Sequence, residues 1–238
     1  MQEELYNLDG QKVLIIGGSS RMGLEIARLS AKFGAEVIIS SRSESKLKTA
    51  IVSLSEHVTS YAANAAIAQE AAQILQDLAP LDHILVTASS GTSASSITDT
   101  SPEIAQAAFN RFWISYHILH YARDFMKPSG SITLISGSSG RRPLVGYGVW
   151  SSLHGSIESL VRPAALELAP IRVNAISPGG IGLAPDQQLA HHAGQPIDVA
   201  KMAITLMTNP AVTSTIVDVD GGERLGSWSG EVSSRQSN

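Results

Sequence analysis

Short apolar runs rich in β-branched residues alternate along this chain with longer segments whose apolar positions recur at helical spacing. The runs are typical of buried strands, and the longer segments are typical of helices with one apolar face. The predicted strands are 13–16, 36–41, 57–61, 82–87, 131–136, 171–176 and 215–219. The predicted helices begin after Gly23 and then occupy 44–54, 67–78, 102–126, 151–169 and 196–207. We expect a turn at 127–130, a loop at 137–148 and irregular structure at 178–194.

Strands that are separated by helices require crossover connections, which are right-handed in nearly all parallel sheets. The predicted fold is therefore α/β: a single-domain, Rossmann-like, doubly wound parallel sheet of about seven strands with helices on both faces. We expect this domain over 1–225 and a flexible tail, rich in Ser and Gly, over 226–238. Ligands of such sheets bind where the strand order reverses.

A Gly/Ser turn joins the first predicted strand to the first predicted helix. Small residues let the backbone approach an anion closely, and the free N–H groups and dipole of the helix N-terminus attract it. The turn therefore predicts a phosphate site formed by Gly17, Ser19, Ser20, Arg21, Met22 and Gly23. A purely structural turn is the alternative, because a single glycine-rich turn is not specific.

Composition excludes several classes of function. A net charge of −4 and a pI near 6.0 leave no basic surface for nucleic acid or anionic membrane, so we expect a small-molecule substrate. The absence of cysteine excludes disulfides, thiolate catalysis and cysteine-bound zinc. His117 and His120 are three residues apart but lack a matching carboxylate beyond Asp124, so we expect no metal. No signal peptide or membrane-spanning run is visible, and we expect a cytoplasmic protein.

Several further landmarks occur in a fixed order: SSRSESKL after the second strand, GSITLIS in the fifth, LELAPIRVNAISPGG near 166–180, and VDGG at 219–222. Together with the opening turn, they show that the chain resembles the short-chain dehydrogenase/reductase superfamily over nearly its whole length. The resemblance implies a dinucleotide cofactor. It also implies a homodimer or homotetramer that pairs through the helices at 102–126 and 151–169.

The end of the second strand indicates which dinucleotide is bound. An acid there would bind the ribose 2′-hydroxyl of NAD, but this chain has Ser41, Arg42 and Ser43, with no acid before Glu44. An arginine can pair with a 2′-phosphate and stack on adenine, and the serines can donate hydroxyls to the same phosphate, which favours NADP(H). The alternative is an ordinary solvated arginine.

The resemblance places other residues around the cofactor. Arg21 replaces the usual glycine of the turn, and it can either reach a phosphate or crowd the site. Asn64 matches the position of an acid that binds the adenine amino group. On the nicotinamide side, the resemblance implies contacts from Pro178, Gly179 and Ile181.

The residues at the catalytic positions differ from those of most family members. Most members use Asn, Ser, Tyr and Lys, with the tyrosine acting as the acid or base at the substrate oxygen. Counting back from Glu167 and Asn174 puts Trp150 and His154 at the Tyr and Lys positions, Gly137 at the Ser position and Arg111 at the Asn position. No shift of one residue supplies a lysine.

Three functions fit this pattern. The first is an NADPH-dependent reductase of iminium ions, imines or related carbonyl compounds, in which Trp150 contacts the cation and Arg111 anchors the substrate. RFW at 111–113 with SG at 136–137 is similar to a noncanonical branch whose fungal members reduce iminium intermediates of alkaloid pathways. The second is a carbonyl reductase that uses Tyr147 or His154 as its acid. The third is a non-enzymatic NADP(H)-binding protein or scaffold.

Each candidate residue also has a structural interpretation. Trp150 can be core packing, His154 a packing or capping residue, and Arg111 a surface or subunit-contact residue. These alternatives require a structure to resolve.

Overall fold

The computed structural model describes residues 6–54, 57–88 and 95–225. Seven strands form one parallel sheet in the order β3-β2-β1-β4-β5-β6-β7. The strands are β1 (Lys12–Ile16), β2 (Glu36–Ser41), β3 (Val58–Ala62), β4 (Leu81–Val86), β5 (Met126–Ile135), β6 (Arg172–Pro178) and β7 (Ile216–Val219). The helices are α2 (Arg21–Lys32), α3 (Glu44–Val52), α4 (Ala68–Leu78), α5 (Pro102–Tyr121), α6 (Gly148–Glu167) and α7 (Pro196–Thr208). The predicted fold class is confirmed.

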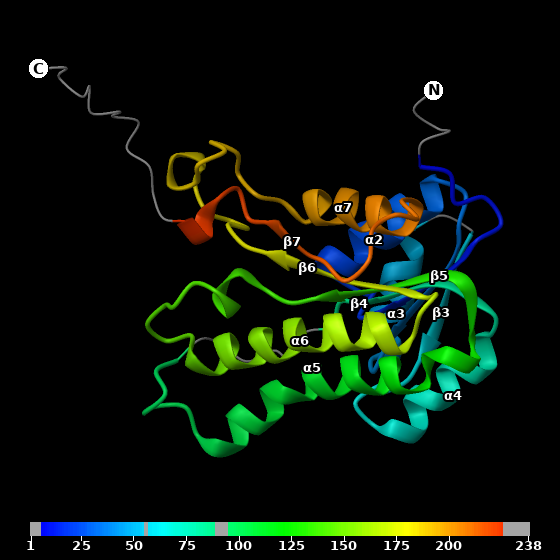
Figure 1. The fold of residues 1–238 in the computed structure, drawn as a ribbon, viewed down its shortest axis with the longest axis horizontal. Coiled ribbons are helices and arrows are strands. Elements are labelled where there is room, and N and C mark those ends of the chain that lie inside the picture. Colours follow the sequence, from blue (N-terminus) through cyan, green and yellow to red (C-terminus); the bar gives the residue numbers. More distant parts are fainter. Residues whose placement is uncertain (1–5, 55–56, 89–94, 226–238) are drawn as a thin grey trace, which may run out of the picture.

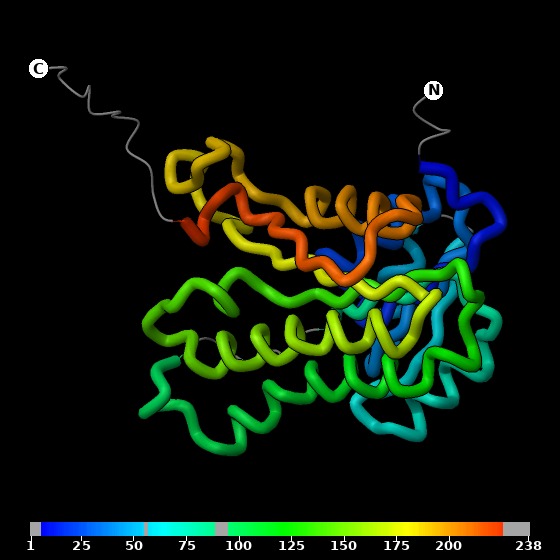
Figure 2. The backbone as a smooth tube through the Cα atoms, in the orientation of Figure 1, coloured from blue at the N-terminus to red at the C-terminus, as the bar shows by residue number. Residues whose placement is uncertain are grey.

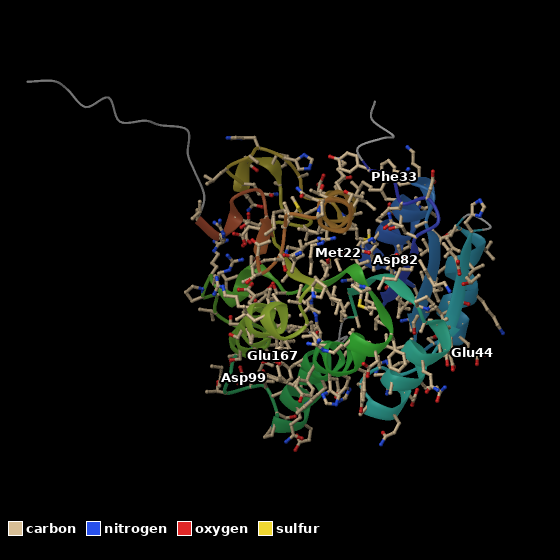
Figure 3. The ribbon with its side chains drawn as sticks, turned by 45° about the vertical axis from the view of Figure 1, so that its right-hand side comes forward. Met22, Phe33, Glu44, Asp82, Asp99 and Glu167 are labelled. Atoms are coloured by element: carbon tan, nitrogen blue, oxygen red, sulfur yellow. The ribbon has the colours of Figure 1, made fainter. Side chains whose placement is uncertain are left out.

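Alternating residues of the strands face two hydrophobic cores. Leu14 and Ile16 of β1 lie in the core that α4, α5 and α6 cover, whereas Val13 and Ile15 lie in the core under α2, α3 and α7. Figure 1 shows α5 and α6 on one side of the sheet and α2 and α7 on the other. Side chains fill both layers between the helices and the strands (Figure 3). A strand buried on both faces accounts for the continuous apolar runs in the sequence.

The strand order reverses between β1 and β4. The Thr87 amide and hydroxyl both donate to the Ile16 carbonyl, at 2.8 Å and 3.0 Å, so the two strands end side by side. Residues 179–195 loop out beyond the carboxyl end of β6, next to the segment that follows β7 (Figure 2). The carboxyl edge of the sheet therefore carries both the opening turn and this loop.

Most predicted boundaries differ from the structure by up to three residues, and two segments differ by more. The helix predicted at 102–126 ends at Tyr121 and continues as the short 3-10 helix Ala122–Asp124. The residues predicted as a turn, 127–130, lie within β5 and form an irregularity, because Leu81 pairs with Met126 while His83 already pairs with Ser131. The predicted flexible tail at 226–238 lies outside the described residues.

Candidate functional site

The first of two adjoining pockets lies at the reversal of strand order. The ends of β1, β2, β3 and β4 and the N-termini of α2 and α3 surround it. Its lining contains every residue predicted on the adenosine and phosphate side: Gly17, Ser19, Ser20, Arg21, Met22, Gly23, Ser41, Arg42, Ser43 and Asn64. Residues from three separate segments of the chain therefore share one site.

Close packing explains the glycines of the opening turn. Gly17 has a φ of +90°, and a Cβ there would lie 2.5 Å from the amide nitrogen of Ala88. A Cβ on Gly23 would lie 2.4 Å from the carbonyl oxygen of Gly17. Arg21, the first residue of α2, has a φ of +49°, a left-handed conformation that glycine adopts more readily. The backbone thus retains the shape that a glycine would give it, although the side chain is an arginine.

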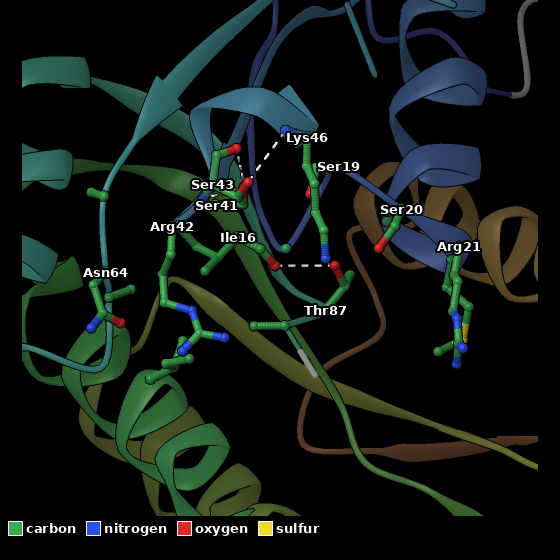
Figure 4. A pocket seen from close by; sticks show the side chains of 17 residues that line it. Ile16, Ser19, Ser20, Arg21, Ser41, Arg42, Ser43, Lys46, Asn64 and Thr87 are labelled. Carbon is green, nitrogen blue, oxygen red and sulfur yellow. Dashed lines mark hydrogen bonds between the residues drawn. The ribbon is translucent and has the colours of Figure 1, made fainter. Parts of the chain in front are cut away.

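The first pocket is cationic. Arg21, Arg42 and Lys46 line it, and no Asp or Glu occurs among the described residues of its lining. Figure 4 shows Arg42 beside Ser41, which ends β2, and Ser43, with Lys46 at the start of α3. The amide of Lys46 donates to the hydroxyl of Ser43, the N-cap of α3, which fixes this turn. Such a lining fits an anionic dinucleotide that carries an extra phosphate near β2.

Lys46 was missed in the sequence analysis. Its signal was its spacing: four residues after Arg42 and in the first turn of a helix that begins at the carboxyl edge of the sheet. Basic residues in a first helical turn do not stabilise the helix dipole, so this position itself points to an anion.

Asn64 lies after β3 and shapes the adenosine side of the first pocket. Its amide oxygen accepts a hydrogen bond from the Ala66 amide at 3.3 Å, and its own backbone amide donates to the Glu70 carboxylate at 2.7 Å. The Asn64 side-chain oxygen, which matches the group that binds the adenine amino group in the family, therefore already accepts one hydrogen bond from the backbone.

The second pocket adjoins the first, because Arg21 and Met22 line both. Pro178, Gly179 and Ile181, predicted on the nicotinamide side, all contribute to it. Of the predicted catalytic residues, Arg111, Tyr147 and His154 line it as well. The structure thus joins the expected nicotinamide side to three of the four expected catalytic residues.

Trp150 does not line the second pocket. It is half-buried on α6, packs against the hydrophobic core, and borders a separate small hollow with Thr100, Ile104, Ala108, Gly146 and Val149 among its walls. Its ring centre lies 5.9 Å from that of His154. The expected contact between Trp150 and a substrate cation is therefore replaced by packing behind His154.

Arg111 and His154 form one hydrogen-bonded unit. Arg111 is buried on α5, and its Nη2 donates to the carbonyl oxygens of Ile135 and Ser136 at 2.7 Å and 3.0 Å. Its Nη1 lies 3.2 Å from Nε2 of His154, whose Nδ1 lies 2.8 Å from the hydroxyl of Ser139. The guanidinium therefore joins the end of β5 to α6, which rules out a surface role for Arg111.

Burial controls the charge of this unit. Desolvation and the nearby Arg111 charge lower the pKa of His154 to about 3, so the imidazole is neutral at pH 7. Desolvation also lowers the pKa of Arg111 to about 10, at which the guanidinium remains charged. Both ring nitrogens of a neutral His154 are engaged with protein groups, which favours a positioning role for this residue over that of the proton donor in one of the predicted functions.

Gly137 is needed for the same unit. A Cβ at this position would lie 2.4 Å from Cε1 of His154, so the imidazole occupies the space where a longer side chain would stand. The residues at the usual Asn, Ser and Lys positions are therefore packed against one another as a group.

Ion pairs hold the wall of the second pocket. Ser138 donates to the Glu223 carboxylate at 2.9 Å, and Arg142 forms hydrogen bonds with both the carboxylate and the carbonyl oxygen of Glu223. Arg141 pairs with Asp218 of β7 and, at 3.2 Å, with Glu158 of α6. This network ties residues 138–142 to the segment that follows β7.

Comparison with known proteins agrees with this geometry. The family model described as enoyl-(acyl carrier protein) reductase matches residues 17–223. The short-chain dehydrogenase/reductase ATR9 of Stachybotrys chlorohalonatus is 31% identical over 91% of this chain and 98% of its own length.

The chain belongs to the short-chain dehydrogenase/reductase family.

Other members of the short-chain dehydrogenase/reductase family are also similar to the chain. The short-chain dehydrogenase/reductase malC of Malbranchea aurantiaca is 26% identical over 92% of this chain and 96% of its own length. The solved structure of MalC reductase/Diels-Alderase from the same organism superposes with a TM-score of 0.86 at 25% identity, covering 94% of this chain and 100% of that one. Membership of this family agrees with a pocket at the reversal of strand order and supports oxidoreductase activity in general.

Neither a metal-binding cluster nor a membrane-spanning helix occurs among the described residues. Across 6–54, 57–88 and 95–225, no three His, Asp or Glu side chains gather as they would around a metal ion. His117 instead donates from Nδ1 to the carbonyl oxygen of Ala65 at 3.1 Å. Within the same ranges, every helix is too short or too polar to cross a lipid bilayer.

Proposed function

We propose that this protein is an NADP(H)-dependent oxidoreductase that transfers hydride to an iminium ion, an imine or a related carbonyl compound in secondary metabolism. The first pocket supports NADP(H), because the side chains of Arg42 and Lys46 and the serines at the end of β2 line the part of it where a 2′-phosphate would lie. When bound, NADPH would supply the hydride and become NADP⁺; addition to an iminium carbon forms the C–H bond while the C=N electron pair becomes the nitrogen lone pair, whereas an imine or a carbonyl compound also needs a proton.

The replaced catalytic group carries this proposal. Gly137 has no side chain to donate a proton, Trp150 lies outside the second pocket, and His154 is a neutral imidazole with both nitrogens engaged. An iminium ion needs no acid, since it already has the positive charge that a protonated carbonyl acquires. Arg111 remains a positioning residue, with its charge directed largely toward two backbone carbonyls.

Tyr147 supports a second candidate, a ketone reductase. Its side chain lines the second pocket and is 38% exposed, so a phenol is available there as an acid. This function would require Tyr147 to act without the lysine that usually lowers the pKa of the catalytic tyrosine. The two candidates therefore differ in whether Tyr147 is essential.

The test follows deuterium from labelled NADPH or NADH into products. The acceptors are 2-methyl-1-pyrroline, the N-methyl-3,4-dihydroisoquinolinium ion and acetophenone. We expect label transfer from NADPH to the first two. Arg42→Asp should weaken NADPH binding about 10- to 100-fold and favour NADH, because a charge-assisted hydrogen bond is replaced by repulsion. The matched control is Arg28→Asp on the exposed side of α2, outside both pockets.

Other outcomes contradict parts of the proposal. Equal affinity for NADPH and NADH in the wild type would refute the role of Arg42. Reduction of acetophenone alone, lost in Tyr147→Phe, would establish the ketone reductase. Tight NADPH binding with no label in any product would indicate a cofactor-binding protein without this chemistry.

A further inference from the structure

The hydroxyl of Ser139 lies at the end of the Arg111–His154 unit. Ser139 belongs to the short 3-10 helix Ser138–Gly140, is 5% exposed, and lines the second pocket. The sequence did not single it out, because it lies two residues beyond the position of the usual catalytic serine.

Hydrogen-bond chemistry fixes the direction of the bonds in this unit. A guanidinium has donors only, so Nε2 of His154 must accept from Arg111. A neutral imidazole that accepts at Nε2 carries its proton on Nδ1, and this proton is therefore donated to the oxygen of Ser139. The Ser139 hydroxyl then has its own proton left to donate. No acceptor for that proton lies among the residues that the structure describes.

Two neighbouring serines behave differently. The Ser136 hydroxyl donates to the Glu158 carboxylate at 2.8 Å, and the Ser138 hydroxyl donates to the Glu223 carboxylate at 2.9 Å. All three serines line the second pocket, but the protons of Ser136 and Ser138 are committed to the protein. Ser139 alone of the three has a proton to offer to a ligand.

We propose that Ser139 donates a hydrogen bond to a neutral acceptor atom of the substrate, with His154 and Arg111 as the positioning residues that set the direction of its hydroxyl. The inference rests on the proposed function and narrows its substrate class. Of the substrates in the proposed function, the iminium ion has a nitrogen with no lone pair to accept a hydrogen bond, so for this ion the acceptor is a second neutral group of the substrate, such as a carbonyl oxygen. The substrate class is a cyclic iminium ion that carries an amide or ketone.

The first test measures binding of two probes to the NADP⁺-loaded protein, where no turnover occurs. The probes are the N-methyl-3,4-dihydroisoquinolinium ion and its 3-carboxamide. We expect Ser139→Ala to weaken binding of the carboxamide about five- to tenfold, the effect of one lost hydrogen bond, and to leave the parent ion unchanged. Ser139→Thr keeps a hydroxyl and should bind the carboxamide about as tightly as the wild type does. The control is Ser152→Ala, an exposed serine on α6 that bonds only its own helix.

The second test measures the histidine tautomers by ¹⁵N NMR and does not depend on activity. We expect His154 to carry its proton on Nδ1. His83 is the internal reference, because its Nε2 lies 2.6 Å from the Gln11 amide oxygen, which requires the opposite tautomer. Arg111→Met removes the donor to Nε2, so part of the His154 population should carry its proton on Nε2, and the tautomer of His83 should not change.

Each outcome decides a different point. If Ser139→Ala lowered the affinity for both probes equally, or for neither, the role of Ser139 would be overturned. A wild-type protein that binds neither probe would overturn it too. A His154 proton on Nε2 would overturn the positioning unit. If the carboxamide effect and the tautomer are as expected but no iminium ion is reduced, the proposed function fails while the assignment of Ser139 holds.

Discussion

At the scale of single residues, Gly137 makes room for His154. We expect Gly137→Ala to lower the free energy of unfolding by about 1–3 kcal/mol, because the added methyl group would displace an imidazole that two hydrogen bonds hold. Urea denaturation measures the change. Gly155→Ala is the control: it is the next residue after His154, and a Cβ there meets nothing within 4 Å.

In the control, the same added methyl group should raise the stability by up to about 1 kcal/mol, since alanine favours a helix. If both variants changed the stability equally, the contact between Gly137 and His154 would have no energetic weight.

The residue scale also shows where sequence reasoning ends. Motif spacing located Arg111, His154 and Gly137 as replaced positions, and the structure shows that they touch. Which atoms touch depends on side-chain directions across α5, α6 and the end of β5, and spacing carries no information about these. The same limit explains why Trp150 was expected in the substrate site although it lies behind His154.

At the scale of elements, α5 carries an exposed aromatic face. Trp113 and Tyr116 are 47% and 41% exposed, and their rings contact each other and that of Phe112. Large exposed aromatics are typical of interfaces. We propose that α5 pairs with a second copy of the chain in a homodimer or homotetramer.

We expect the wild type to sediment as a dimer or tetramer and Trp113→Glu to sediment as a smaller species, because a buried unpaired charge opposes association. Analytical ultracentrifugation with NADP⁺ present measures this. The control is Val52→Glu, at a residue of α3 that is 88% exposed. A monomeric wild type, or an equal shift in both variants, would contradict the proposal.

Among the elements, strands such as β1 and β2 were the most predictable, because each is a short, largely apolar run followed by turn residues. The 127–130 segment was predicted less well. Its Pro and Gly are typical of a turn, but the salt bridge of Lys127 to Asp82, at 2.9 Å, holds this segment beside β4. Such a tertiary contact has no signature in local sequence.

At the scale of the whole molecule, two buried histidines link stability to pH. Burial lowers the pKa of His83 to about 4, and with the Arg111 charge it lowers that of His154 to about 3, from a usual value of 6.5. Below pH 6.5 the unfolded chain therefore binds protons that the folded chain does not, and stability is lost as the pH falls.

We expect the free energy of unfolding to decrease between pH 6.5 and pH 5, with each histidine contributing up to about 1.4 kcal/mol per pH unit. Urea denaturation at several pH values measures the slope. His120→Gln, at an exposed residue of α5, should leave it unchanged. A flat profile would show that the folded protein binds as many protons as the unfolded chain over this range, so that the pKa values of the two histidines are not lowered.

The contact between Gly137 and His154 also limits how this site can change over evolution. A serine at 137 would meet the imidazole, and a lysine at 154 would place its charge against the Arg111 guanidinium. Each single substitution that restores a usual catalytic residue is therefore harmful by itself and becomes tolerable only after a neighbouring position has also changed. Such epistasis would keep a lineage that acquired this group from returning to tyrosine chemistry by single substitutions.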